Sequence, residues 1–259
     1  MTTEEKIQRV KDLRPIDDVF FEVLAQNPRV CEEMLRTILD DQNLIVEDVI
    51  PQSSERNIYG RSVRLDALCI LGDGTRCNIE VQRSDRDDHL RRARFNASSI
   101  TVYDSNPGEQ FRDVVELYIV YISEFDFLKG NLPIYHVDKV IRENGHVIDD
   151  GLHEIFVNTV VNDGSRVSDL MACFTRKEVN DSRFPELSAE VDRLKTTEGG
   201  VTAMCKVMEN YINEAVNEAK KETTIDLLVS MIKDGIITIS EAAKRAQLPE
   251  EEFRMRLNK

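Results

Sequence analysis

Tryptophan is absent from the 259-residue chain, and cysteine and histidine are scarce, at five and four residues. The cysteine count is odd and no Cys-x-x-Cys pair occurs, so a disulfide framework or a zinc ribbon is not indicated. The histidines lack metal-site spacing, and neither a Gly-x-Ser-x-Gly motif nor a glycine-rich phosphate loop is present. Without tryptophan, a platform for stacking bases is not evident either. Zinc, thiol and serine-hydrolase chemistry are therefore poorly supported.

Long apolar runs are also absent. No stretch approaches the roughly 20 residues that a membrane span needs. The first twelve residues are polar and charged, unlike the apolar stretch of a secretory signal. We therefore expect a cytoplasmic protein with no membrane segment.

Positive charge is in deficit, since 34 lysines and arginines face 48 acids, for a formal net charge of −14. Such a charge by itself argues against broad nucleic-acid binding. The distribution is uneven, however, because nine arginines and only six acids fall between residues 56 and 94. The arginines are Arg56, Arg61, Arg64, Arg76, Arg83, Arg86, Arg91, Arg92 and Arg94. They form either a solvated, salt-bridged surface or a cationic patch selective for phosphate.

The most informative segment, residues 63–82, predicts a β-hairpin. Residues 63–71 and 76–82 alternate in the manner of strands on either side of Gly72-Asp73-Gly74, a strong turn signal. Strand periodicity places Glu80 and Gln82 on one face of the second strand. Asp66 lies on the first strand, just across the hairpin.

The register of this hairpin decides whether the acids meet. A two-residue turn would pair Asp66 with Val81, whereas a three-residue loop or a bulge pairs Asp66 with Glu80. We predict the second register, because only it brings the carboxylates together. Two such carboxylates repel unless a cation lies between them, and oxygen ligands suit Mg²⁺ or Mn²⁺. Alternatively, Asp66, Glu80 and Gln82 are ordinary surface residues of a hairpin with one solvated face.

The order of these residues along the chain resembles the PD-(D/E)XK nuclease superfamily, in which an Asp and then Glu-x-Lys form the metal site. The closer resemblance is to the bacterial PD-(D/E)XK nuclease family transposases, or recombination-promoting nucleases, which show Glu-x-Gln instead. Members also open with an Asp-x-x-Phe helix, matched by Asp17 and Phe20. A helix bearing arginines follows the Glu-x-Gln strand, matched by Arg91, Arg92 and Arg94. The resemblance spans roughly residues 10–235.

The resemblance implies a metal-dependent DNA endonuclease linked to mobile elements, recombination or phage defence. It makes Asp66 and Glu80 the metal ligands and places Gln82 where lysine is usual. A neutral amide can orient water but cannot titrate. The alternative is therefore a weak or inactive nuclease fold that acts as a DNA- or protein-binding module. Asp17 would assist the metal or water, or else stabilise the first turn of a helix.

Arginines after the second hairpin strand are the candidate contacts to DNA phosphates. Arg91 and Arg94 are three residues apart and so share a helical face. They can equally form salt bridges to Asp87 and Asp88. The predicted DNA-binding set is Arg83, Arg86, Arg91 and Arg94.

The order of elements predicts an α/β fold, a mixed sheet flanked by helices with a restriction-endonuclease-like core in residues 1–164. Residues 165–259 form a predicted helical extension. Its stretch from Met204 to Val216 has helical spacing that can pair with a second subunit, so we expect a homodimer. Residues 239–257 resemble a small helix-turn-helix with Ser240 as a cap. Acids at the start of its second helix would repel DNA, which favours packing or oligomerisation there.

Overall fold

The computed structural model describes residues 3–51, 54–55, 63–86 and 88–257. The chain forms two compact units, Met1–Cys205 and Lys206–Lys259. We expected the core to end at residue 164, but two further helices, α5 (Arg166–Phe174) and α6 (Pro185–Thr196), belong to the first unit. Both pack on α3 (Pro28–Ile38) through buried apolar faces, which extends this unit to residue 205.

The first unit contains a six-stranded sheet in the order β1-β4-β5-β6-β10-β7. Its strands are β1 (Val46–Pro51), β4 (Ala67–Leu71), β5 (Arg76–Gln82), β6 (Leu117–Ser123), β7 (Ile134–Val137) and β10 (Leu152–Asn158). Two small ribbons accompany it, β2 (Ser54–Glu55) with β3 (Val63–Arg64) and β8 (Lys139–Val140) with β9 (Val147–Ile148). The remaining helices are α1 (Thr3–Asp12), α2 (Asp18–Leu24), α4 (His89–Asp104) and the 3-10 turn η1 (Phe111–Asp113).

Strand directions in this sheet are mixed. β5 runs parallel to β6, and β6 parallel to β10, while β1, β4 and β7 pair antiparallel with their neighbours. A parallel pair needs a crossover connection, and α4 supplies it between β5 and β6. The predicted mixed sheet flanked by helices, with helices at the C-terminal end, is therefore confirmed.

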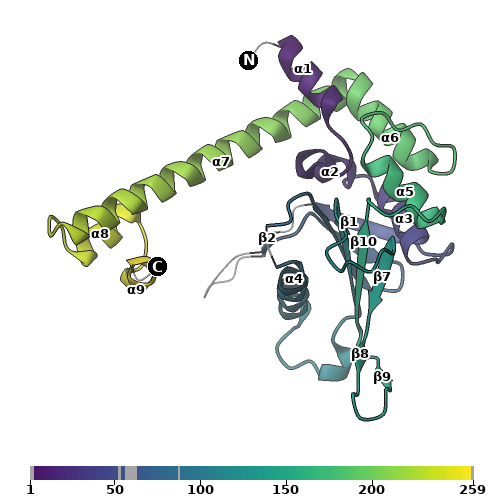
Figure 1. The fold of residues 1–259 in the computed structure, drawn as a ribbon, viewed down its shortest axis with the longest axis horizontal. Helices are drawn as coiled ribbons and strands as arrows, with labels where there is room; N and C mark the ends of the chain where they lie inside the picture. Colours follow the sequence, from purple (N-terminus) through teal and green to yellow (C-terminus); the bar gives the residue numbers. More distant parts are fainter. Residues whose placement is uncertain (1–2, 52–53, 56–62, 87, 258–259) are drawn as a thin grey trace. The chain divides into compact units, whose positions relative to one another are not determined.

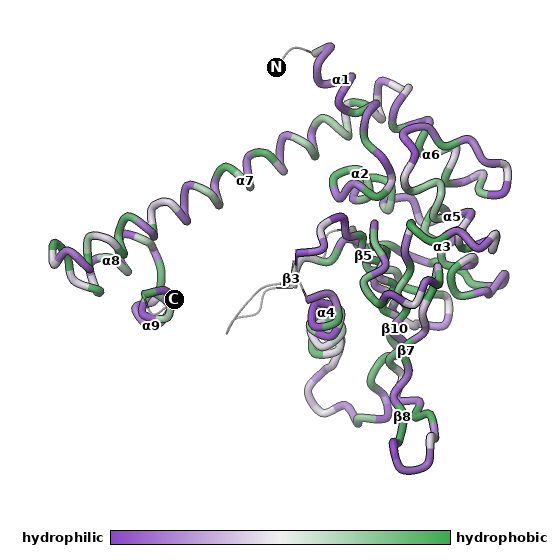
Figure 2. The backbone as a smooth tube through the Cα atoms, in the orientation of Figure 1, coloured by the Kyte–Doolittle hydropathy of each residue, from purple (hydrophilic) through white to green (hydrophobic). Residues whose placement is uncertain are grey.

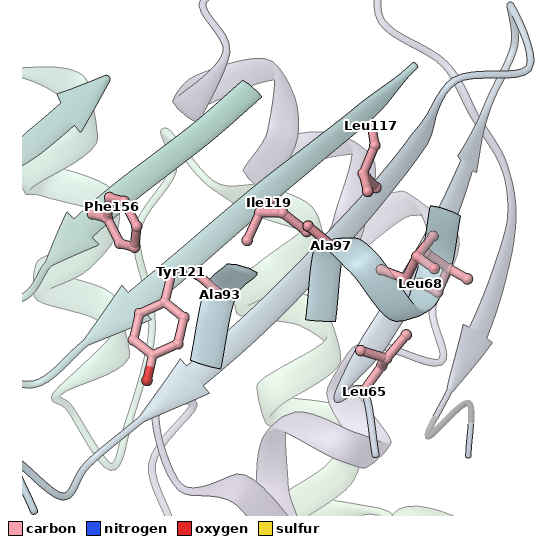
Figure 3. Close-up of a cluster of buried hydrophobic side chains, with 9 residues drawn as sticks. Leu65, Leu68, Ala93, Ala97, Leu117, Ile119, Tyr121 and Phe156 are labelled. Carbon is pink, nitrogen blue, oxygen red and sulfur yellow. The ribbon is translucent and has the colours of Figure 1, made fainter. Parts of the chain in front are cut away.

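Helices cover both faces of the sheet (Figure 1). On one face, Ala93 and Ala97 of α4 lie over Leu68, Ile119 and Tyr121 (Figure 3). These small side chains let the helix approach the strands closely. On the other face, α3, α5 and α6 gather together (Figure 1). The candidate residues of β5 belong to the α4 face, because its strand register pairs Glu80 with Tyr121.

Three neighbouring thiols lie on the face of the sheet opposite α4. Cys31 of α3 contacts Cys69 of β4 and lies close to Cys77 of β5, and all three are buried. The contact with Cys69 and burial raise the pKa of Cys31 well above its ordinary value. Burial also raises the pKa of Cys77, and the three side chains act as packing residues.

The hairpin between β4 and β5 has the predicted register. Ala67 pairs with Ile79 and Cys69 with Cys77. The Leu71 amide donates to the Thr75 carbonyl at 2.9 Å, which leaves a three-residue loop, Gly72 to Gly74. Gly74 has a φ of 88°, a conformation that favours glycine. The predicted first strand is interrupted, however, at Leu65 and Asp66, between β3 and β4.

The second unit consists of the distal part of α7 (Glu198–Lys233), α8 (Ile239–Ala246) and α9 (Glu250–Leu257). Phe253 of α9 is fully buried against Ile225 of α7 and Ala242 of α8. α8 begins at Ile239, so Thr238 caps it instead of Ser240. Thr238 and Glu241 form a capping box, in which each side chain accepts from the other's amide.

Apolar and polar residues alternate along α7 (Figure 2). Within the described part of the chain, no helix is long and apolar enough to cross a membrane.

Candidate active site

Asp66 and Glu80 come together where the hairpin strands lose their regular pairing. The Val81 amide donates to Asp66 Oδ2 at 2.9 Å, and the Asp66 amide donates to Glu80 Oε1 at 3.3 Å. Each carboxylate thus accepts from the backbone of the opposite strand. Glu80 is fully buried and Asp66 half-buried. The register prediction is therefore confirmed, and the two acids are neighbours.

A buried asparagine fixes one oxygen of Glu80. Asn78 lies two residues earlier on the same strand face and is fully buried. Its amide donates to Glu80 Oε1 and to the Ala67 carbonyl, both at 3.1 Å. Because Oε1 has two donors and Oε2 faces α4, the carboxylate has a set orientation.

Arg92 of α4 supplies the positive charge at this site. Its guanidinium lies 3.4 Å from Glu80 Oε2 and donates to Gln82 Oε1 at 2.9 Å. The Gln82 amide donates in turn to the Ser84 carbonyl at 2.9 Å. Gln82 therefore lies on the same strand face as Glu80, as predicted, and Arg92 of the neighbouring helix contacts both side chains.

Burial governs the electrostatics of the acid pair. Burial and the nearby Glu80 carboxylate raise the pKa of Asp66 well above its ordinary value. Burial also raises the pKa of Glu80, against the opposing influence of Arg92 and Asn78. The ionised forms of both carboxyls are therefore disfavoured, mainly because they are removed from water.

Asp17 and Asp18, at the start of α2, differ in the groups that they interact with. Asp17 is 8% exposed, accepts from the Arg14 amide at 2.6 Å and pairs with Arg83 at 2.7 Å. Its carboxylate is therefore engaged by two arginines. Asp18 is the acid whose charge acts on Asp66 and raises the pKa of Asp66. Desolvation by the surrounding protein in turn raises the pKa of Asp18 itself, although the residue is exposed.

Sequence reasoning missed both Asp18 and Arg92 as site residues. For Arg92 no local signal exists, because its position over Glu80 depends on how α4 crosses from β5 to β6. For Asp18 no sequence signal separates it from Asp17, because the choice depends on the turn that Arg14 forms with Asp17.

The predicted DNA-binding arginines divide into two kinds. Arg83 pairs with Asp17 and, at 3.1 Å, with Glu124, while Arg91 pairs with Asp88 at 3.2 Å. Arg86 and Arg94 are exposed and have no ion pair with any residue in the described ranges. Arg56, Arg61 and Asp87 lie outside those ranges.

An aromatic cluster packs around His89 at the start of α4. His89, only 4% exposed, lies 2.9 Å from the Tyr121 hydroxyl through Nδ1 and 3.2 Å from Asp85 through Nε2. The rings of Phe125 and Phe127 pack against its imidazole. Because Tyr121 is the strand partner of Glu80, this cluster fixes the first turn of α4 and, one turn later, Arg92.

The acid pair fits a hard divalent cation. Both donors are carboxylates, and no described residue donates a hydrogen bond to Asp66 Oδ1. In the described ranges, no group of three or more His, Cys, Asp or Glu side chains has metal-binding geometry. A cation here would keep several waters, as Mg²⁺ does at sites with one or two carboxylates. Asp66 and Glu80 are the residues that would hold it.

The sequence of residues 17–161 matches the model of the PD-(D/E)XK nuclease family transposases. Comparison with curated proteins and with solved structures found no match. The matched segment covers more than half of the chain and contains Asp18, Asp66, Glu80 and Arg92. As the resemblance of the hairpin predicted, the chain belongs to the PD-(D/E)XK nuclease family transposases.

Proposed function

We propose that the protein is a DNA endonuclease in which Asp66 and Glu80 hold a Mg²⁺ or Mn²⁺ ion. The observation that carries this proposal is the geometry of the acid pair, in which Asp66 and Glu80 each accept a hydrogen bond from the other's side of the hairpin and so lie together. When bound, such an ion polarises a phosphodiester and acidifies water. Mobile-element, recombination and phage-defence roles are all compatible with this activity.

The chain's own residues would bind and orient the reactants. Gln82 lies on the same strand face as Glu80 and can orient the attacking water through its amide. Arg92, 34% exposed on its side chain, reaches the site from α4 and can contact a phosphate oxygen. Asp18 adds a third acid within the electrostatic range of Asp66. The exposed Arg86 and Arg94 can contact the DNA backbone nearby.

Plasmid cleavage tests the activity and the site together. The purified protein should nick supercoiled DNA with Mg²⁺ or Mn²⁺ and not with EDTA. Asp66→Asn and Glu80→Gln should each lower the rate at least about 100-fold, since each removes a ligand charge at nearly constant shape. Asp113→Asn, an exposed acid on η1, is the matched control and should cut at the normal rate. Cleavage that survives both site variants would refute the assignment.

A second candidate function is a weakened nuclease fold that binds DNA or protein. The observation in its favour is that Arg92 already engages both Glu80 and Gln82. Calorimetric titration with Mn²⁺ separates the two. The absence of both Mn²⁺ binding and plasmid cleavage would support the second candidate. The cytoplasmic location and the homodimer stay predictions from the sequence.

A further inference from the structure

A basic groove lies within the second compact unit, where α7 meets the turn between α8 and α9. Its volume is about 670 Å³. Four cationic side chains line it, Lys220 and Lys221 from α7, Arg245 from α8 and Arg256 from α9. Among the described lining residues, Glu222 is the one acid. We call this groove, with its four cations, the basic groove.

The cations of the basic groove have no counter-ions among the described residues. All four are exposed, and none of their cationic side-chain groups forms an ion pair or hydrogen bond with a residue in the described ranges. Arg254, two residues before Arg256, is by contrast paired with Glu250 at 2.8 Å. Four like charges around one concave surface repel each other, and a polyanion bound there would relieve that repulsion.

The second unit also differs from the rest of the chain in its net charge. Residues 206–259 contain nine basic and ten acidic residues, so this unit is almost neutral while the chain carries −14. The other residues therefore hold nearly all of the net negative charge. A polyanion therefore meets less repulsion at the second unit than the net charge of the chain implies.

Packing holds the three helices of the groove in place. Phe253 is fully buried between α7 and α8, and the Thr238 capping box fixes the start of α8. Gln247 adopts a left-handed conformation, with a φ of 55°, and turns the chain into α9. The four cations thus extend from helices whose positions are held by packing.

We propose that the basic groove binds the phosphate backbone of double-stranded DNA. Cations from three helices suit a run of phosphates better than a single anion. Asn217, Thr224 and Gln247 add neutral groups of the kind that contact phosphate and sugar. The described lining contains no aromatic side chain, which disfavours single strands because those are bound by base stacking. DNA would meet the groove and not the acidic start of α9.

Duplex binding by the full-length chain tests this proposal. The protein carries Asp66→Asn and is kept in EDTA, so the outcome is independent of cleavage. Fluorescence anisotropy with a short labelled duplex is measured between about 50 and 200 mM KCl. Neutralising Lys220, Lys221, Arg245 and Arg256 to glutamine should weaken binding at least about ten-fold at the lower salt. The slope of log K against log salt should fall by up to about 3.6, or about 0.9 for each lost phosphate contact.

A charge-matched variant is the control. Lys206→Gln, Lys233→Gln, Lys244→Gln and Arg254→Gln remove the same charge from the same unit outside the groove, and should leave most of the affinity and slope intact. Equal losses in both variants would overturn the proposal, because net charge alone would then explain binding. An unchanged slope in the groove variant, or a larger loss for a single strand or an RNA hairpin than for the duplex, would overturn it too.

Folding of the groove variant is checked by circular dichroism. If that variant unfolds, Lys220→Glu with Lys221→Glu, both on the exposed face of α7, gives the same test with two changes. This pair should abolish duplex binding at the higher salt. Duplex affinity equal to that of the parent would overturn the proposal. The two proposals fail separately. Plasmid cleavage by the Asp66 and Glu80 variants would refute the proposed active site, whereas unchanged duplex binding by the groove variant would refute the proposed DNA-binding groove.

Discussion

Arg92 is the residue on which the charge balance at Glu80 depends. Its guanidinium contacts a carboxylate that is itself fully buried. Removing one partner of such a pair leaves an uncompensated charge. Arg92→Gln should therefore lower the free energy of unfolding in EDTA by about 1–3 kcal/mol, less than for a fully buried pair because Arg92 is partly exposed. Urea unfolding measures this change.

Metal should offset that loss. A bound Mn²⁺ supplies the cation that Arg92→Gln removes, so the difference from the parent should shrink in Mn²⁺. Arg94→Gln, two residues along the same helix and exposed, is the matched control, with an expected change within about 0.5 kcal/mol. A destabilisation by Arg92→Gln that is equal in EDTA and in Mn²⁺ would contradict this account.

The protonation of Asp66 and Glu80 predicts a pH dependence with a defined sign. Because the pKa values of both carboxyls are raised in the fold, the folded protein retains protons that the unfolded chain releases above about pH 4. Their contribution to stability is thus present at low pH and lost as pH rises through the folded values. A metal ion needs the ionised carboxylates. The rise in Tm caused by Mn²⁺ should therefore increase with pH.

Thermal unfolding at a series of pH values, with Mn²⁺ or EDTA, measures this rise. Asp66→Asn should reduce the Mn²⁺ effect towards zero at every pH, since it removes one ligand. A Mn²⁺ effect in the parent protein that stays constant from acid to neutral pH would show that these carboxylates are not the groups that metal binding deprotonates.

At the scale of elements, Lys195 of α6 joins segments that are distant in sequence. Its ammonium donates to the carbonyls of Lys11, at 3.1 Å, Leu13 and Lys177. It also lies 5.2 Å from the centre of the Phe20 ring. Burial lowers the pKa of Lys195 to about 8, so the side chain remains a cation at neutral pH. These contacts hold the chain that leads from α1 to Asp17 and Asp18.

Lys195→Met should destabilise the protein by about 2–4 kcal/mol, because three carbonyls lose a charged donor. Chemical denaturation measures the change. Lys177→Met provides the comparison, since that ammonium pairs with Asp12 on the surface at 2.6 Å and should contribute less than about 1 kcal/mol. Similar losses for the two variants would mean that the buried contacts of Lys195 are not the stabilising ones.

The sequence predicted the hairpin better than the helices around it. Register followed from strand alternation and the Gly72 to Gly74 loop, both local features. The position of Arg92 over Glu80 depends on how α4 crosses from β5 to β6, which no local pattern specifies. Likewise, α5 and α6 have helical spacing whether or not they pack on α3, so the first unit extends beyond residue 164.

At the scale of the molecule, the second unit has a small core of its own. Phe253 is its largest fully buried side chain and packs with Leu228 of α7 and Ala243 of α8. Phe253→Ala should cost about 3–5 kcal/mol locally and release α8 and α9. Hydrogen exchange should then accelerate in residues 225–257 and stay unchanged in β5, because the units have separate cores.

Met255→Ala is the control for this change. Met255 is two residues further along α9 and 64% exposed, so its truncation should leave the exchange of residues 225–257 nearly unaltered. If Phe253→Ala accelerated exchange to the same extent in β5, the chain would unfold as a single cooperative body and the division at residue 205 would have no thermodynamic meaning.

Buried thiols give the molecule a practical property. Cys31, Cys69, Cys77 and Cys173 are buried, and Cys205 alone among the five cysteines is partly exposed. A thiol reagent reacts with accessible thiolate, so a maleimide dye should label the folded protein at one place. That place lies in α7 at the junction of the two compact units. The native chain therefore carries its own attachment point for a dye near the end of the first unit, with no cysteine to remove.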